Sequence, residues 1–127
     1  MKRNRPEQQI QKAVLEHLAW RGVPGLWWCH VPNGGYRTAI EAAIFKGLGL
    51  IPGVPDLLLV YRGQLYALEL KAEGGRLSPN TQIATHERMR AAGVVVGVAY
   101  GIDEALAWLE LWQLLRLRRD VAERVAS

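Results

Sequence analysis

The sequence contains few of the residues that build disulfide-bonded, zinc-binding or membrane proteins. Its 127 residues include one cysteine, Cys29, and three histidines, His17, His30 and His86. A single cysteine cannot form an intramolecular disulfide, which is typical of a protein from a reducing cytoplasm. The histidines are scattered without the spacing of zinc ligands, so we expect no zinc site.

Long apolar runs and repeats are also missing. No apolar stretch is long enough to span a membrane, and residues 1–6 are basic with no apolar signal core behind them. We therefore expect a cytoplasmic protein that is neither secreted nor embedded in a membrane. The length fits one domain with a real core and leaves no room for a second. The net charge of +4 and the pI of about 9.6 favour a polyanionic partner.

A β-hairpin is predicted at the centre of the chain. Arg62-Gly63 is an X-Gly pair between two apolar runs, residues 57–61 and 65–71. Such a pair is typical of a two-residue hairpin loop, which pairs Tyr61 with Gln64 and fixes the register of every position behind them.

This register places Asp56 opposite Glu69. Directly opposed residues share a face, with Cβ atoms about 4.5 to 5.5 Å apart, and the period of two puts Lys71 on the same face. Facing carboxylates repel unless something compensates, and carboxylate oxygens without histidine or cysteine suit Mg²⁺ or Mn²⁺. Lys71 would then orient or deprotonate an attacking water. The alternative is that Asp56 caps a strand entrance and that Glu69 and Lys71 form a surface ion pair of little energetic value.

The remaining apolar patterns predict an α/β domain with a mixed sheet. Helices are expected at 6–20, 38–48 and 79–92 and after Asp103, and further strands at 26–31 and 94–100. The two central strands are apolar on both faces, which predicts helices on both sides of the sheet. Residues 94–100 are expected to run parallel to 65–71, because a helical crossover joins the two segments.

Glu7 is the acid of interest in the first helix. It lies three residues before Ile10 and seven before Val14, so it extends the buried stripe of the helix. A carboxylate at the edge of a core is costly unless a positively charged group or a hydrogen-bond donor pairs with it. The alternative is a first-turn glutamate that interacts with the helix dipole, which contributes about 0.3 to 1 kcal/mol.

Several polar residues in loops are candidates for ligand contact. Asn33-Gly34-Gly35 would let the backbone approach a ligand, or it forms a simple hairpin turn, which the helical pattern that follows argues against. Arg37 and Arg76 are candidates for contacts to phosphate, with solvated side chains as the alternative. Gln82, in the first turns of its helix, either faces the cleft or is solvated.

Together these motifs resemble a known family. Asp56 followed by Glu69-Leu70-Lys71 after a hairpin is similar to the PD-(D/E)xK nuclease core. The resemblance to its VRR-NUC branch, the virus-type replication-repair nuclease domain, rests on five blocks in order: Pro6-Glu7 with Ile10-Gln11, Val31 to Gly35 with Arg37, Gly53 to Asp56, Glu69 to Lys71, and Leu77-Ser78-Pro79 with Gln82. One departure is visible, because two residues, Asn80 and Thr81, separate Ser78-Pro79 from Gln82 where the family usually has one.

The resemblance covers roughly residues 5–112 and implies a restriction-endonuclease-like fold spanning 1–127 as a single VRR-NUC nuclease domain, with a short basic and polar tail at 116–127. It implies that Asp56, Glu69, the carbonyl of Leu70 and Glu7 bind Mg²⁺ or Mn²⁺, and that Lys71 and Gln82 complete the catalytic set. The implied activity is structure-specific endonuclease cleavage of branched or four-way junction DNA, as in a Holliday junction resolvase. The implied setting is a homodimer acting in DNA repair or recombination at the nucleoid of a bacterial or phage-infected cell.

Two other classes of function compete with this one. A nucleic-acid-binding module of the same fold that has lost catalysis would keep the charge, although buried carboxylates without partners are hard to retain as mere structure. A structural dimer built through Trp108 and Trp112, one turn apart on the last helix, would explain none of the acids. These tryptophans belong either to the core or to an interface, and the tail at 116–119 is either a frayed helix end or an arm that contacts DNA.

Overall fold

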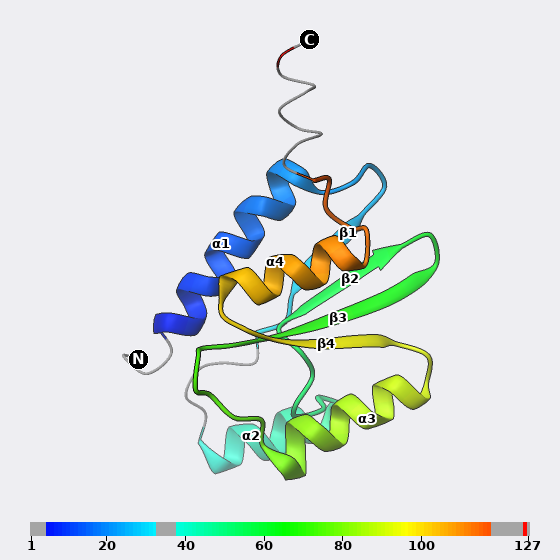
Figure 1. The fold of residues 1–127 in the computed structure, drawn as a ribbon. Coiled ribbons are helices and arrows are strands. Elements are labelled where there is room, and N and C mark those ends of the chain that lie inside the picture. The colour runs from blue at the N-terminus through cyan, green and yellow to red at the C-terminus, as the bar shows by residue number, and fades with distance from the viewer. Residues whose placement is uncertain (1–4, 33–37, 118–125, 127) are drawn as a thin grey trace.

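The central hairpin forms as the sequence predicts. In the computed structural model, which describes residues 5–32, 38–117 and 126, β2 (Leu57–Tyr61) and β3 (Gln64–Lys71) are antiparallel, and Tyr61 pairs with Gln64 (Figure 1). Arg62 and Gly63 both have positive φ angles, 49° and 80°, as a type I′ turn requires. The predicted register is therefore confirmed.

The sheet is mixed and has four strands in the order β1-β2-β3-β4. At one edge, β1 (Trp27–His30) is antiparallel to β2. At the other edge, β4 (Val95–Tyr100) is parallel to β3, as expected for a strand reached by a helical crossover.

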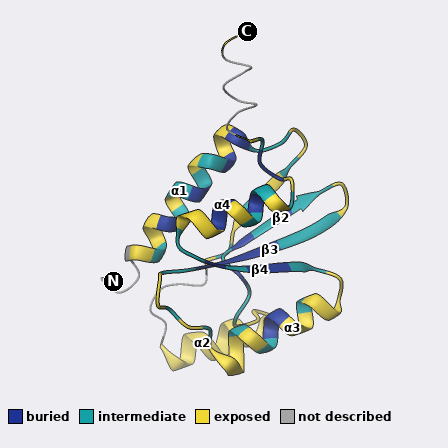
Figure 2. Cartoon of the chain, viewed as in Figure 1, coloured by how far each residue is buried: buried dark blue, intermediate teal, exposed yellow. Residues whose placement is uncertain are grey.

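Helices lie on both sides of this sheet (Figure 1). One side carries α1 (Arg5–Arg21) and α4 (Ile102–Leu111), and the other carries α2 (Ala39–Gly47), η2 (Pro79–Ile83) and α3 (Ala84–Ala91). The apolar core is built mainly between α1, α4 and the sheet, where Val14, Leu57, Leu68 and Leu109 are fully buried (Figure 2). None of the helices within the described part of the chain is long and apolar enough to cross a membrane.

Helix α2 forms where its spacing predicts, but it buries nothing. Thr38 caps it in a capping box, in which the Glu41 amide donates to Thr38 Oγ1 at 3.1 Å and the Thr38 amide donates to Glu41 Oε1 at 3.3 Å. Local sequence signals therefore explain why the helix begins here. Its apolar residues Ile40 and Ile44 are nevertheless 75% and 56% exposed, because the helix lies at the rim of the molecule and packs little against the other described elements (Figure 2).

The start of α4 differs from the prediction. The N-cap is Gly101, with φ of 94°, and Asp103 lies within the first turn. We expect Asp103 to cap this helix from its sequence pattern, but the Glu104 carboxylate inside the helix accepts a hydrogen bond from the Tyr100 amide at 3.0 Å instead.

Both tryptophans of α4 pack onto the sheet. Trp108 Nε1 donates to the Val98 carbonyl at 3.0 Å, and the Trp112 ring lies 5.3 Å from that of Tyr66. A Cβ atom at Gly97 would come within 2.9 Å of Trp108, so β4 needs glycine where the indole crosses it. Of the two interpretations of this pair, the structure supports the core.

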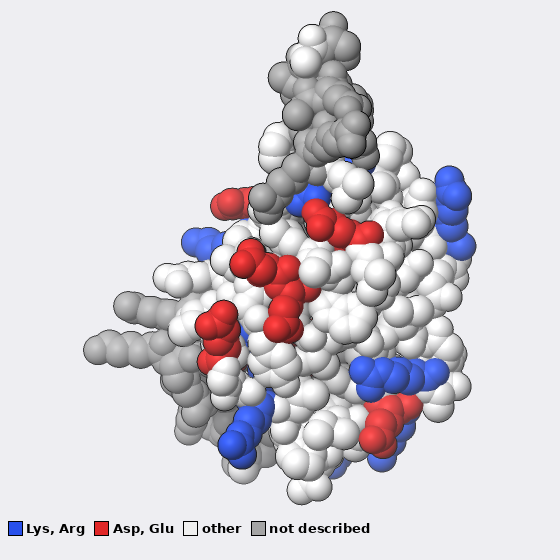
Figure 3. Space-filling model, viewed as in Figure 1, with Lys and Arg blue, Asp and Glu red and all other residues white. Residues whose placement is uncertain are grey.

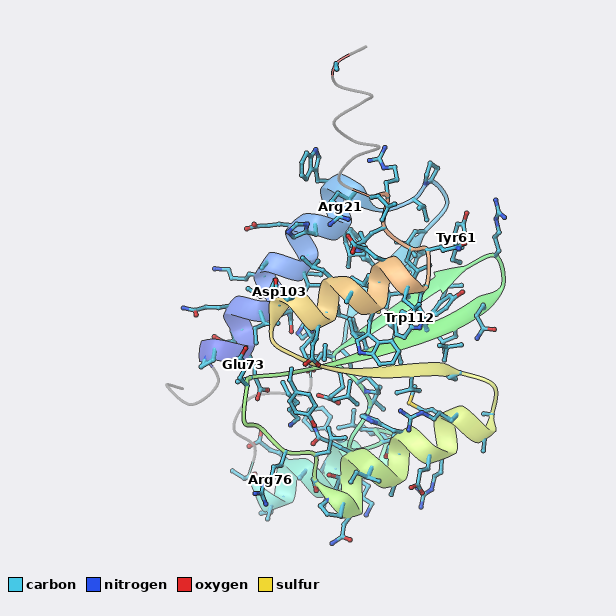
Figure 4. All side chains as sticks on the ribbon, viewed as in Figure 1. Arg21, Tyr61, Glu73, Arg76, Asp103 and Trp112 are labelled. Carbon is cyan, nitrogen blue, oxygen red and sulfur yellow. The ribbon has the colours of Figure 1, made fainter. Side chains whose placement is uncertain are left out.

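Arg21 is a fully buried cation that the sequence patterns did not indicate. Its guanidinium binds the Glu110 carboxylate on α4, and its Nε donates to the Arg116 carbonyl at 2.9 Å. The side chain thereby joins the end of α1 to α4 and to the segment that follows it (Figure 4). A buried charge is tolerated only when it is paired in this way.

Glu110→Ala is expected to destabilise the fold by about 3 kcal/mol, because it leaves the Arg21 guanidinium buried without its counter-ion. Chemical denaturation measures the change, with Glu16→Ala on the exposed face of α1 as the control. Equal stability of the two variants would show that the ion pair does not hold α1 to α4.

Candidate metal centre

Asp56 is held between two strands at the end of the sheet. Its carbonyl accepts the Val31 amide at 2.7 Å on the β1 side. Its carboxylate oxygen Oδ2 accepts the Leu70 amide at 2.7 Å on the β3 side. Because Leu57 pairs with Leu68, the next position places Asp56 opposite Glu69, as the hairpin register predicts. The carboxylate is thus fixed by backbone contacts.

Glu69 is a buried acid, with 2% of its surface exposed. Its pKa is raised from 4.5 to about 9, first by burial and then by a hydrogen bond with the Asp56 side chain and by the negative charge of Asp56. Without a cation this carboxyl therefore holds its proton at neutral pH. A carboxylate pair of this kind is stable in its charged form only when a positive charge compensates it.

Lys71 and Glu7 complete the cluster. The Lys71 ammonium lowers the pKa of Glu69 and the Glu7 carboxylate raises it, so both charges lie within electrostatic reach of the buried acid. The Lys71 stem passes Gly75, where an added Cβ would lie 3.6 Å from Lys71 Cβ. Asp56, Glu69 and Lys71 therefore lie at one end of the sheet as predicted, and Glu7 acts on Glu69 electrostatically without forming a three-carboxylate group with it.

The backbone of Leu70 is turned toward the Asp56 side chain. The Lys71 carbonyl accepts the Gly101 amide at 2.9 Å, beyond the end of β4, so Lys71 directs its backbone toward β4. The N–H and C=O groups of one strand residue point to the same neighbour, and successive residues alternate. Leu70 therefore directs both groups toward Asp56, consistent with its amide bonding Asp56 Oδ2.

These donors fit a hard divalent cation of the Mg²⁺ type. Such an ion takes one or two carboxylates and keeps several waters or phosphate oxygens in its shell. Within the described ranges, no group of three or more His, Cys, Asp or Glu side chains is arranged to hold a metal. Two carboxylates lie at this end of the sheet, and strand geometry turns the Leu70 carbonyl to the same side, a donor set that suits an open Mg²⁺ or Mn²⁺ site and not a closed zinc site.

The loop that leads to Asp56 packs against η2 and α3. Gly53 has φ of 89°, and a Cβ there would lie 2.4 Å from the Thr81 carbonyl oxygen. The Thr85 hydroxyl donates to the Pro52 carbonyl at 2.6 Å. Neither contact was predicted, because each joins residues about thirty positions apart with no local pattern between them.

Gln82 lies in a π-helical turn. The Ile83 amide donates to the Ser78 carbonyl at 3.0 Å, a bond across five residues, so η2 takes up the extra residue that separates Gln82 from Ser78-Pro79. Gln82 Oε1 accepts the Ser78 amide at 2.9 Å, which is the backward half of a capping box. This contact gives Gln82 a structural role, and its part in catalysis stays a prediction.

His86 is the buried polar residue that sequence reasoning missed. Only 1% of it is exposed, and its Nε2 lies 3.2 Å from Glu69 Oε1. Burial, followed by the nearby Arg90 charge, lowers the pKa of His86, so the contact is a hydrogen bond of a neutral imidazole and not an ion pair. The one available signal was its position four residues after Gln82, on the same side of the helix.

A cleft of about 460 Å³ lies beside this loop, between α2 and η2. Its lining is apolar apart from Lys46, Thr81 and Gln82. The cleft reaches Gly53 and Val54, just before Asp56, and so it adjoins the candidate metal centre.

The charged surface limits where a polyanion can approach. Figure 3 shows acidic side chains gathered over α4 and beside it, which disfavours a phosphate backbone on that part of the surface. Arg76 is exposed on the loop between β3 and η2, which also carries Glu73 (Figure 4). The predicted contacts Asn33, Gly34, Gly35 and Arg37 lie outside the described residues.

A hairpin that presents Asp56, Glu69 and Lys71 at the end of a mixed sheet, with helices on both sides, is the architecture of the restriction-endonuclease-like class. Two solved structures share it. One, described as a VRR_NUC domain protein, has a TM-score of 0.68 at 24% sequence identity, over 86% of this chain and 89% of its own. The other, described as a VRR_NUC domain, has a TM-score of 0.56 at 26% identity, over 83% of this chain and 95% of its own.

No family model and no curated protein matches the sequence itself. The chain therefore has the nuclease-type fold of these VRR-NUC domain structures, and the resemblance predicted from its motifs is confirmed at the level of the fold.

The raised pKa of Glu69 predicts how stability depends on pH in metal-free buffer. The folded protein holds this proton more tightly than the unfolded chain, so the stabilisation is full below pH 4.5 and is lost as the pH rises toward 9. Relative to Glu69→Gln, the wild type should lose up to about 1.4 kcal/mol per pH unit in this window. Thermal unfolding of the wild type and of Glu69→Gln in EDTA at several pH values measures the difference. If the melting temperatures of the two proteins change with pH in parallel, the raised pKa of Glu69 is contradicted.

Proposed function

We propose that the domain is a Mg²⁺- or Mn²⁺-dependent endonuclease that hydrolyses phosphodiester bonds of DNA. The observation that carries the proposal is the pair of carboxylates Asp56 and Glu69, one of them buried, with the Leu70 backbone turned toward them. A fold could replace such a pair with apolar residues at no cost in stability, so its presence favours a ligand.

Each residue has a defined task in this proposal. Asp56, Glu69 and the Leu70 carbonyl would hold the metal, and Glu7, in the first turn of α1, would act on it through a bound water. When bound, the metal would activate a water and neutralise charge on the phosphate. Lys71, half-buried beside Glu69, would hold the attacking water or donate to a phosphate oxygen.

The substrate we propose is branched DNA, in particular a four-way junction, cut by a homodimer. The described part of the chain offers one candidate metal centre, and a junction with two-fold symmetry requires two cuts, so two copies would act together. The basic pI of about 9.6 suits a phosphate backbone. Light scattering at micromolar concentration tests the dimer, and a monomer with full junction-cutting activity would contradict it.

Cleavage of an end-labelled four-way junction by the purified protein tests the activity. We expect cutting in Mg²⁺ or Mn²⁺, none in EDTA, and less on a linear duplex of the same sequence. Junction binding without cutting in either metal would instead support the alternative, a binding module of this fold that has lost catalysis.

Glu7→Gln is expected to raise the Mn²⁺ concentration needed for half-maximal cleavage by about 10- to 100-fold, the usual cost of weakening a metal site. Glutamine keeps the helix propensity and most of the volume, so α1 should stay folded. If Glu7 only interacts with the helix dipole, the metal dependence will be unchanged and the melting temperature slightly lower.

A further inference from the structure

The contact between His86 and Glu69 joins two side chains that are both almost fully buried. His86 is 1% exposed and Glu69 is 2% exposed, and His86 Nε2 lies 3.2 Å from Glu69 Oε1. They come from different elements, α3 and β3, so the contact spans the interface between the sheet and the helix that covers it. An apolar residue would fill this position without the cost of burying an imidazole.

The acceptor character of a bound carboxylate sets the direction of the hydrogen bond. A neutral imidazole carries one N–H donor, and a metal-bound carboxylate can only accept. With a cation in place, His86 Nε2–H therefore donates to Glu69 Oε1, and the second carboxylate oxygen remains available for the metal. The hydrogen bond limits rotation of the carboxylate, which a long side chain would otherwise be free to make.

The residue before His86 anchors the other half of the site. Thr85 Oγ1 donates to the Pro52 carbonyl at 2.6 Å, in the loop that leads to Asp56. Thr85 is 5% exposed, so this anchor is buried as well. Two successive residues of α3 thus contact the strand that carries Glu69 and the loop that leads to Asp56.

We propose that His86 is a positioning residue of the metal centre, which fixes the orientation of Glu69 through a hydrogen bond from Nε2 to Oε1. This inference rests on the proposed function, because it assumes that Glu69 binds a metal. It makes α3 part of the machinery of the site, although the helix supplies none of the proposed metal ligands.

Direct Mn²⁺ binding, measured by calorimetry on the DNA-free protein, separates positioning from packing. His86→Leu keeps the approximate volume and removes the donor, and we expect Mn²⁺ affinity to fall about 10- to 100-fold. His86→Gln retains an amide donor, and its affinity should stay within a few-fold of the wild type. Glu87→Gln, at the exposed neighbouring position of α3, is the matched control and should not change affinity.

Metal-free melting temperatures complete the test. A positioning role predicts that His86→Leu melts no lower than His86→Gln, although it binds Mn²⁺ more weakly. Equal Mn²⁺ affinity of His86→Leu and the wild type would overturn the inference, and so would an equal loss of affinity and stability in both variants. If His86→Leu does not fold, His86→Asn replaces it, because its shorter amide does not reach Glu69 and its affinity should fall while His86→Gln keeps it.

The wild-type titration distinguishes the two proposals. A wild-type protein that binds no Mn²⁺ contradicts the proposed function itself. A wild type that binds Mn²⁺ as tightly as His86→Leu contradicts only the role of His86.

Discussion

Asp56→Asn and Glu69→Gln should each lower cleavage of junction DNA by at least about 10³-fold, because a lost metal ligand removes several kcal/mol of transition-state stabilisation. Both substitutions keep the shape of the side chain and remove its charge. Single-turnover cleavage measures the effect, and a binding titration should give nearly unchanged affinity, since affinity comes mainly from basic contacts.

The controls for this prediction are internal. Asp103→Asn changes an exposed acid on α4 and should cut at the wild-type rate. In metal-free buffer at neutral pH the Glu69→Gln variant should melt at or above the wild-type temperature, because the neutral amide does not have to take up a proton on folding, as the buried Glu69 carboxyl does. Metal-dependent cutting retained by either site variant would remove that residue from the ligand set.

Gly53→Ala should reduce cleavage by about 10²-fold and destabilise the fold by about 2 to 3 kcal/mol, although it adds a single methyl group. The positive φ of 89° is strained for alanine, and the new Cβ would lie 2.4 Å from the Thr81 carbonyl oxygen. Backbone must therefore move, and Asp56 lies three residues away. A displacement of about 1 Å in a catalytic group is sufficient for a loss of this size.

Gly63→Ala is the matched control. Gly63 has φ of 80° in the hairpin turn, and nothing lies within 4 Å of an added Cβ. Both variants carry a similar backbone strain, and only Gly53→Ala adds the collision with η2. Equal cleavage by the two variants would mean that the docking of the Asp56 loop on η2 does not matter for the site.

The sequence predicts those parts of the site that depend on turn geometry and on the alternation of side chains along a strand. A two-residue turn at Arg62-Gly63 leaves one register for the hairpin, and that register places Asp56 opposite Glu69 and Lys71 on the same face. The apolar faces of the same strands correctly predicted helices on both sides of the sheet. These inferences succeed because they depend on neighbours in sequence and on the period of a strand.

The remaining contacts depend on how distant elements pack. His86 meets Glu69 across the interface of α3 and β3, and Arg21 meets Glu110 across that of α1 and α4. No periodicity links such partners, so the sequence alone does not pair them. For α2 the apolar pattern correctly predicts the helix, but it does not predict which element covers the apolar face.

The central claim is that a divalent cation binds between Asp56, Glu69 and the Leu70 carbonyl. Anomalous X-ray diffraction from crystals soaked in MnCl₂ tests it most directly, since the manganese signal locates the ion independently of any activity. We expect a peak in contact with both carboxylates and that carbonyl, and no peak there in crystals of Glu69→Gln. Wild-type crystals with no manganese at this position, or with manganese bound only elsewhere, would contradict the claim.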